Sequence, residues 1–239
     1  MKRWRRLLVL VFCLLVPLQQ VWANQDLLAQ GIAAQKAGNN ELALTLLGKY
    51  LEQNPGVTEV RRHLALALAG LGRNTEALAE LDRGLAAHPQ DLQLLLAKAN
   101  LLAGMERQPE AIAVLTAALK CDPQNVEVLK ERGECQAQEG AFPEAMADLN
   151  RAAQLAPRDP WVFNKRGLVW FCQGDYQKAV ADFSTAISLA PDSPHAYFFR
   201  GNIYRYHLGE MDKAIADYRK ACALGHPLSC LELEKLGAK

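Results

Sequence analysis

The sequence predicts an all-α fold, an α-solenoid of about six helix-turn-helix repeats, and three observations carry this prediction. Prolines recur every 34 residues, at Pro55, Pro89, Pro123, Pro157 and Pro191. An alanine lies 12 positions before each proline, at Ala43, Ala77, Ala111, Ala145 and Ala179. A glycine or alanine lies a further 12 positions upstream, at Gly31, Ala65, Ala99, Gly133 and Gly167, and Gly201 opens a sixth copy. Such a period is typical of stacked helix pairs that bury their apolar faces only against their neighbours.

The first 23 residues differ in composition from the rest of the chain. Four basic residues, Lys2, Arg3, Arg5 and Arg6, precede an apolar run from Leu7 to Leu18, and compact residues end at Ala23. This pattern predicts a cleaved signal peptide over residues 1–23 and hence export to the periplasm or secretion. The alternative is an uncleaved anchor, although the apolar run contains Pro17 and is shorter than the roughly 20 residues that span a bilayer. Lipid attachment at Cys13 is disfavoured, because Phe12 precedes it and the apolar run continues beyond it.

Removal of the signal peptide changes the charge balance. Residues 1–23 hold four of the 27 basic residues and none of the 26 acidic ones, so the remaining chain has a net charge of −3. A slightly acidic chain without a basic cluster lacks the electrostatic attraction that nucleic-acid binding requires. We therefore expect no nucleic-acid partner, no cofactor and no stable membrane insertion after signal cleavage.

The repeat register sets the expected boundaries. We expect one continuous solenoid domain over residues 24–225, followed by a C-terminal capping helix over residues 226–239. The expected repeats cover residues 24–57, 58–91, 92–125, 126–159, 160–193 and 194–225.

The fifth repeat shows why each unit folds back on itself. Asp159 is a good N-cap and Pro160 suits the first helical position, where its missing N–H costs nothing. Gly167 lies on an apolar stripe with Phe163 and Trp170 and allows a second helix to approach closely. Gly174 ends the first helix. The second helix carries an apolar face of Ala179, Phe183, Ala186 and Ile187 and ends before Pro191.

Two repeats depart from this pattern. Gly38, Gly72, Gly140 and Gly174 occupy the same turn position, where the third repeat has Glu106 and a nearby Gly104. In the sixth repeat, Gly201 and Ala214 are 13 residues apart rather than 12. We expect this extra residue to lengthen the turn over residues 207–211.

The pattern resembles the tetratricopeptide repeat family over residues 24–225. The near-complete family signature is Gly167, Trp170, Gly174, Tyr176, Ala179, Phe183, Ala186 and Pro191. The resemblance implies a right-handed solenoid in which the first helix of each repeat lines a concave groove.

The C-terminal tail resembles a cysteine-rich relative of this repeat. That resemblance implies a disulfide between Cys222 and Cys230, one late in a helix and the other early in the next, and an oxidising compartment would permit it. The alternative is two small buried residues. The remaining cysteines, Cys121, Cys135 and Cys172, match no zinc or redox motif, and we interpret all three as buried and inert.

The family register also implies which side chains face the groove. In the early repeats these are Glu59, Arg62, Gln93 and Asn100, a sparse set. In the late repeats they are Glu127, Lys130, Glu134, Trp161, Asn164, Phe171, His195, Phe198, Asn202, Arg205 and Tyr206. Asparagine can hold a peptide backbone and aromatic side chains supply anchor area, so we predict that protein or peptide segments bind to the late repeats.

Some of these aromatic residues have a second interpretation as packing between repeats. We prefer packing for Trp170, Tyr197 and Tyr204, and leave both roles open for Trp161, Phe171 and Phe198. Family members that bind chaperone tails use a lysine and asparagines as a carboxylate clamp. Lys130 matches the lysine, but Glu134 stands where that clamp has asparagine, so chaperone-tail binding is disfavoured.

The sequence offers little support for catalysis. The histidines His63, His88, His195, His207 and His226 are scattered and form no metal-binding or nucleophile motif. Glu127, Glu131 and Glu134 follow successive turns of one helix, which is more typical of a solvated face than of an acid–base site.

Three functional hypotheses follow. The leading one is an exported, non-enzymatic scaffold that docks protein segments during assembly or turnover of a bacterial envelope complex. The second is an accessory factor of a cell-wall hydrolase, or a weak enzyme acting on wall material. The third is a structural element that associates with further copies of itself.

Overall fold

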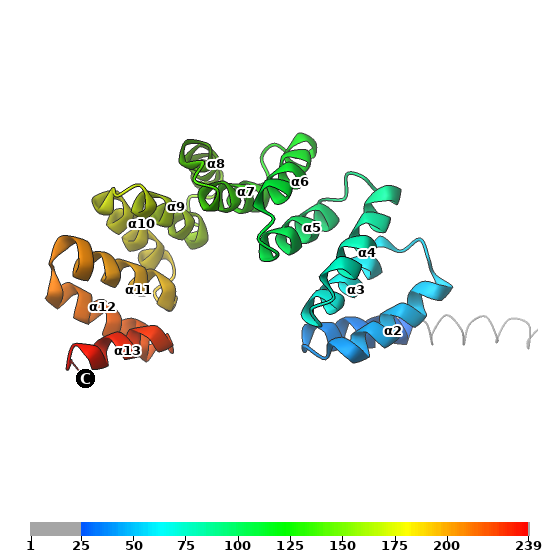
Figure 1. Ribbon diagram of the computed structural model, residues 1–239, viewed down its shortest axis with the longest axis horizontal. Helices are drawn as coiled ribbons and strands as arrows, with labels where there is room; N and C mark the ends of the chain where they lie inside the picture. The colour runs from blue at the N-terminus through cyan, green and yellow to red at the C-terminus, as the bar shows by residue number, and fades with distance from the viewer. Residues whose placement is uncertain (1–24, 239) are drawn as a thin grey trace, which may run out of the picture. The chain divides into compact units, whose positions relative to one another are not determined.

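The computed structural model describes residues 25–238, and every regular element in that range is a helix. The helices follow one another as helix-turn-helix pairs, which confirms the predicted all-α repeat fold (Figure 1). The signal peptide expected over residues 1–23 lies outside the described residues. Within residues 25–238, no helix combines the length and the apolar character that a bilayer crossing requires.

The chain divides into two compact units, one ending at Glu106 and the other beginning at Arg107. In the first unit, helical residues 25–36 precede α2 (Asn40–Gln53), α3 (Thr58–Gly70), α4 (Asn74–Ala87) and α5 (Leu92–Gly104). The second unit contains α6 (Gln108–Cys121), α7 (Val126–Gln138), α8 (Phe142–Leu155), α9 (Pro160–Cys172), α10 (Tyr176–Leu189), α11 (Pro194–Ile203), the π-helical turn η1 (Tyr204–Leu208), α12 (Met211–Ala223) and α13 (Pro227–Lys235). The division falls within the third expected repeat, where the sequence led us to expect one continuous domain.

Polar side chains cap many of the helices at their N-termini. Each of these side chains accepts a hydrogen bond from a backbone N–H in the first turn, which satisfies one of the donors that a helix start leaves unpaired. The capping residues include Asn39, Asp91, Asn125, Asp159 and Asp175. The capping role expected for Asp159 is therefore present, with Pro160 following it at the start of α9.

The periodic alanines form the centre of the core. Ala43, Ala77, Ala111, Ala145 and Ala179 are all fully buried, as is Ala214 in the sixth repeat. Gly167 allows close packing of α9 on α10, because a β-carbon there would lie only 3.2–3.3 Å from the Phe183 ring. The 34-residue register is therefore a packing register, in which the smallest residues stand where paired helices approach most closely.

The turn glycines adopt a conformation that other residues avoid. Gly38, Gly72, Gly140 and Gly174 have φ values of 74° to 79°, the left-handed region that glycine enters without steric cost. Glu106 occupies the equivalent turn in the third repeat with a φ of 59°, and it is the only non-glycine residue with positive φ among residues 25–238. A β-carbon in this region costs roughly 1–2 kcal/mol, so this turn carries backbone strain.

We expect Glu106→Gly to raise the free energy of unfolding by about 0.5–1 kcal/mol, because relief of the strain exceeds the greater unfolded-state entropy of glycine. Urea denaturation followed by circular dichroism measures the change. Gly174→Glu is the matched control, since it places the same side chain in a relaxed left-handed turn and should be destabilising by about 1 kcal/mol. Loss of stability in Glu106→Gly would show that the glutamate makes a compensating contact.

The extra residue of the sixth repeat lies in a helix, so the expected longer turn is wrong. Gly209, with a φ of 70°, takes the turn position, and it lies five residues before Ala214 just as Gly174 lies five before Ala179. The added residue is upstream, where η1 widens the end of the first helix into a π-helical turn. A π-helical turn accommodates one inserted residue without moving the alanine register.

A ladder of arginine–aspartate pairs joins the two helices of the last three repeats. Arg132, Arg166 and Arg200 recur every 34 residues and bind Asp148, Asp182 and Asp217 through two hydrogen bonds each, at 2.7–2.9 Å. Each arginine also donates to the second helix of the preceding repeat, at Thr116, Asn150 or Ser184. In the third repeat the equivalent positions hold Lys98 and Val114, so the sequence lacks this pair where the two units divide.

Candidate functional site

The first helices α7 and α9 of the second unit bring several expected site residues together. We call this surface the α7–α9 face; it consists of Glu127, Lys130, Glu131, Glu134, Asp159, Trp161, Asn164 and Lys165. Trp161 is its most prominent apolar residue, with 53% of its surface exposed. Asp159 fixes the start of α9 by accepting a hydrogen bond from the Trp161 backbone N–H at 2.9 Å, so the indole is presented from a rigid first turn.

Asn164 lies one turn after Trp161 and is only 8% exposed. Its Oδ1 atom is buried and accepts no hydrogen bond from any of the residues that the structure describes. A buried carbonyl oxygen without a donor is costly, and such groups in native proteins are usually satisfied by water or a ligand. Asn164 is therefore an acceptor available to a bound molecule.

Lys130 occupies the same register position on α7, and its ammonium group is already engaged. It is 7% exposed and contacts Asp159 at 3.0 Å and Glu127 at 2.6 Å. Burial acts to lower the pKa of Lys130, but the hydrogen bonds to Glu127 and Asp159 outweigh it and the pKa is raised. Lys130 thus anchors the N-cap of α9, which argues further against a carboxylate clamp of the kind that chaperone-binding members use.

A second lysine, which the sequence interpretation missed, organises the glutamates of α7. Lys165 contacts Glu131 at 3.1 Å and also forms an ion pair with Glu134. Burial acts to lower its pKa, but the hydrogen bonds and charges of the two glutamates outweigh it and the pKa is raised. The expectation that these glutamates form a simple solvated face is therefore wrong. The signal available in the sequence was the 34-residue register that aligns Lys165 with Glu131 of the preceding repeat.

The expected site residues of the sixth repeat are largely occupied by neighbouring residues. Glu232 of α13 forms an ion pair with Arg205 and accepts a hydrogen bond from the Tyr206 hydroxyl at 3.0 Å. Asn202 accepts a hydrogen bond from the buried Tyr218 hydroxyl at 2.8 Å. Sequence reasoning missed Glu232, because it lies beyond the regular repeat register.

The remaining aromatic candidates pack in part against histidines. Phe198 lies 4.3 Å from the His226 ring, centroid to centroid, while exposed His195 meets that ring edge-on at 5.5 Å. Phe171 contacts His207 at 5.4 Å. For Phe171 and Phe198 the structure thus shows packing contacts, whereas Trp161 keeps most of its indole open.

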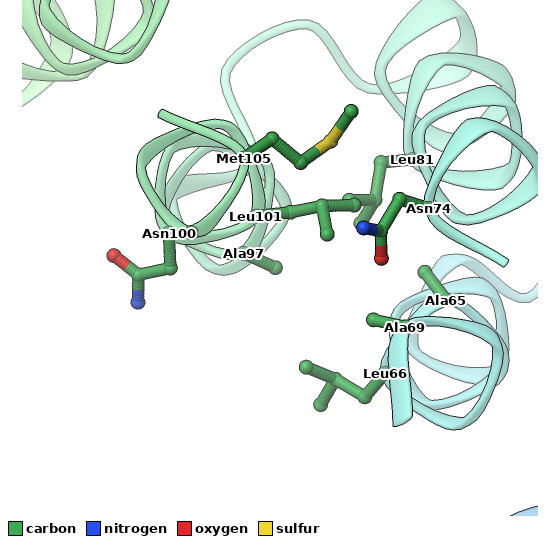
Figure 2. A pocket seen from close by; sticks show the side chains of 10 residues that line it. Ala65, Leu66, Ala69, Asn74, Leu81, Ala97, Asn100, Leu101 and Met105 are labelled. Carbon is green, nitrogen blue, oxygen red and sulfur yellow. The ribbon is translucent and has the colours of Figure 1, made fainter. Parts of the chain in front are cut away.

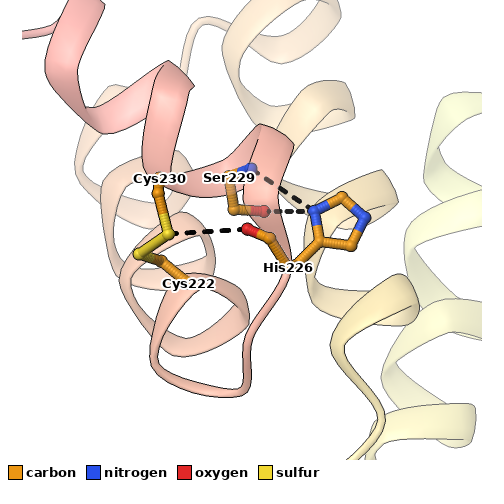
Figure 3. The surroundings of a disulfide bond; sticks show 4 residues. All are labelled: Cys222, His226, Ser229 and Cys230. Carbon is orange, nitrogen blue, oxygen red and sulfur yellow. Dashed lines mark hydrogen bonds between the residues drawn. A yellow bond between two sulfur atoms is a disulfide. The ribbon is translucent and has the colours of Figure 1, made fainter.

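A disulfide joins Cys222 of α12 to Cys230 of α13 (Figure 3). His226 caps α13 by accepting a hydrogen bond at Nδ1 from the Ser229 backbone N–H, at 3.3 Å. The helix that carries Glu232 is therefore fixed both by a covalent bond and by its N-cap.

The three free cysteines differ from one another. Cys135 is buried, and burial raises the pKa of its thiol to about 11, so it is unreactive at neutral pH. Cys121 and Cys172 are exposed, so the interpretation of all three as buried is wrong. Both lie at the last residue of a helix, where the apolar stripe has already turned away from the core.

The first unit contains a hollow of about 410 Å³ where α3, α4 and α5 meet. Figure 2 shows Leu101 and Met105 of α5 pointing toward Ala65 and Ala69 of α3, while Asn100 points away. Small side chains at these positions leave the space open. A smaller hollow of about 230 Å³ is lined by residues of α3 and α5 that include Glu59, Arg62 and Gln93. The early repeats, which we described as sparse, therefore contain the larger hollow and a polar one beside it.

Metal coordination is not a feature of the described part of the chain. Residues 25–238 contain no group of three or more histidine, cysteine, aspartate or glutamate side chains placed to hold a metal ion. The carboxylates of the α7–α9 face are instead arranged around two lysines. This arrangement suits recognition of polar or charged groups.

The fold and the α7–α9 face define a helical repeat protein whose first helices present side chains to a partner. The model of the tetratricopeptide repeat family matches residues 28–91, 96–160 and 171–226, and the chain belongs to that family. A comparison with curated protein sequences finds no match.

Solved structures of other tetratricopeptide repeat proteins share the fold. PilW, a widely conserved type IV pilus biogenesis factor, aligns with a TM-score of 0.74 at 19% identity, over 84% of this chain and 93% of its own. PilF of Pseudomonas aeruginosa aligns with a TM-score of 0.72 at 18% identity, over 91% and 99%. YrrB, described as having an unusual peptide-binding site, aligns with a TM-score of 0.56 at 20% identity, over 79% and 97%. At these identities the likeness concerns the fold.

Proposed function

We propose that this protein is an exported, non-enzymatic scaffold that binds protein segments on the α7–α9 face during assembly or turnover of a bacterial envelope complex. One observation carries the proposal: the half-exposed Trp161 indole lies one helical turn from the unpaired Oδ1 atom of buried Asn164. An aromatic anchor and a fixed polar acceptor on a rigid helix are the elements that concentrate binding energy in protein interfaces.

The cellular setting rests on separate support. The basic and apolar N-terminal segment is typical of an export signal. The disulfide between Cys222 and Cys230 fits an oxidising compartment. The structural likeness to PilW and PilF, whose published descriptions concern type IV pili, is consistent with an envelope role.

The test is a crosslinking pull-down from envelopes of cells that naturally produce the chain. We expect Trp161→Ala to lose the proteins that the parent chain captures, because the truncation removes the exposed anchor without touching the core. Leu228→Ala is a closely matched control: Leu228 is 52% exposed, and it follows Pro227 at the start of α13 as Trp161 follows Pro160 at the start of α9.

Retention of the captured proteins by Trp161→Ala, or equal loss in Leu228→Ala, would contradict the proposal. If the only protein lost is a second copy of the chain, self-association replaces the scaffold hypothesis. Asn164→Ala and Asn202→Ala are less suitable variants, because Asn164 is buried and Asn202 holds the Tyr218 hydroxyl.

A further inference from the structure

The α7–α9 face carries an excess of negative charge that can be counted pair by pair. Lys130 is shared by two carboxylates, Glu127 and Asp159. Lys165 is likewise shared by Glu131 and Glu134. Each three-residue group therefore has a net charge of −1, and the face has an excess of two negative charges.

The other cations of these two helices do not offset this excess. Arg132 of α7 is matched by Asp148, and Arg166 of α9 is matched by Asp182, each through two hydrogen bonds. Of the four carboxylates that surround the lysines, Glu127 is the most exposed, with 56% of its side chain accessible. An incoming cation can therefore approach Glu127 without displacing Lys130 from Asp159.

The sixth repeat adds no uncompensated arginine next to this face. Arg200 is paired with Asp217 through two hydrogen bonds at 2.8 and 2.9 Å. Arg205 is paired with Glu232 of α13, which the disulfide holds in place. Neither arginine is left free to bind an acidic partner.

Two further groups on the face suit a cationic ligand. The exposed Trp161 indole offers the aromatic surface that attracts ammonium and guanidinium groups most strongly. The buried Asn164 Oδ1 atom needs a hydrogen-bond donor and has none among the described residues. Backbone N–H groups and the side chains of lysine and arginine are all donors.

We propose that the α7–α9 face recognises a cationic protein segment, in which a lysine or arginine side chain lies against Trp161 and Glu127 while an N–H group donates to Asn164. The inference rests on the proposed function and specifies the chemistry of the partner. It is the electrostatic opposite of the lysine-based carboxylate clamp, because both lysines of this face are already held by two carboxylates each.

The test uses the purified full-length chain and three fluorescein-labelled ten-residue peptides of leucine, alanine and serine. The peptides carry two lysines, two glutamines or two glutamates at the same positions, and fluorescence anisotropy measures their dissociation constants. We expect the lysine peptide to bind roughly tenfold more tightly than the glutamine peptide. The glutamate peptide should bind more weakly than either. Raising the salt concentration should reduce the preference, because ions screen exposed charges.

Two pairs of variants locate the interaction. Glu127→Gln should weaken binding of the lysine peptide about threefold and leave the glutamine peptide unaffected, because one exposed charge pair is lost. Glu144→Gln is the control, since Glu144 is also an exposed glutamate in the first turn of its helix but lies on α8. Trp161→Ala should weaken the lysine peptide by at least about fivefold, and Leu228→Ala should have no effect.

Equal or tighter binding of the glutamine or glutamate peptide would overturn the proposal, as would no measurable binding of the lysine peptide. Equal effects of Glu127→Gln and Glu144→Gln would overturn it as well. Each of these results is distinct from failure of the proposed function, because the pull-down depends on Trp161 whatever the charge of the partner.

Discussion

Replacing Arg166 by alanine is expected to lower the free energy of unfolding by about 3–5 kcal/mol, because it leaves the buried Asp182 carboxylate without its partner. Asp182 is 6% exposed and receives two hydrogen bonds from Arg166, both at 2.7 Å. These bonds raise the pKa of Arg166, so the pair is charged at any physiological pH. Chemical denaturation followed by circular dichroism gives the change.

The same unit contains a matched exposed pair. Arg107 binds Glu110 through the same two guanidinium atoms, but the two side chains are 40% and 57% exposed. Arg107→Ala should therefore cost less than about 1 kcal/mol. The double variant Arg166→Met with Asp182→Leu should recover most of the lost stability, because it removes both charges together. Equal losses for the two single alanine variants would show that burial does not govern the ladder.

Replacing Phe183 by alanine is expected to cost about 3–5 kcal/mol, through lost burial and the cavity that remains. The Phe183 ring is fully buried, covers Gly167 and stacks on Phe199 with ring centroids 5.8 Å apart. The backbone of α9 at Gly167 presents no side chain that could move into the space. The measurement is the same denaturation experiment.

Phe142 provides the comparison for this prediction, because it is a phenylalanine of the same unit that is only half-buried, at the start of α8. Phe142→Ala should cost clearly less than Phe183→Ala. If the two variants lose equal stability, the close contact between Phe183 and Gly167 is not a principal source of stability.

The fold follows from the sequence to the extent that local rules repeat. Asp159, Gly174 and Ala179 are a cap, a left-handed turn and a packing contact that propensity and register identify without tertiary information. The π-helical turn η1 could not be placed in this way. An inserted residue can widen a helix or lengthen a turn, and only packing of the neighbouring helices decides between them.

The candidate site was predicted less completely, because groove register gives direction but not company. Trp161 is exposed as a ligand contact should be, whereas Lys130 is buried in ion pairs. The partners of Arg205 and Tyr206 come from Glu232, in a final helix that does not continue the 34-residue register. The arginine ladder was visible in the sequence as Arg132, Arg166 and Arg200, but its significance appears only with the buried aspartates in view.

Site-specific photo-crosslinking tests the central claim most directly, the claim that the α7–α9 face contacts a protein partner. A photoreactive phenylalanine analogue replaces Trp161 in one strain and Leu228 in another, in cells that naturally produce the chain. We expect irradiation to yield a discrete crosslinked protein from position 161 and none from position 228. Equal crosslinking at both positions, or none at position 161, would contradict the assignment of this face as the binding site.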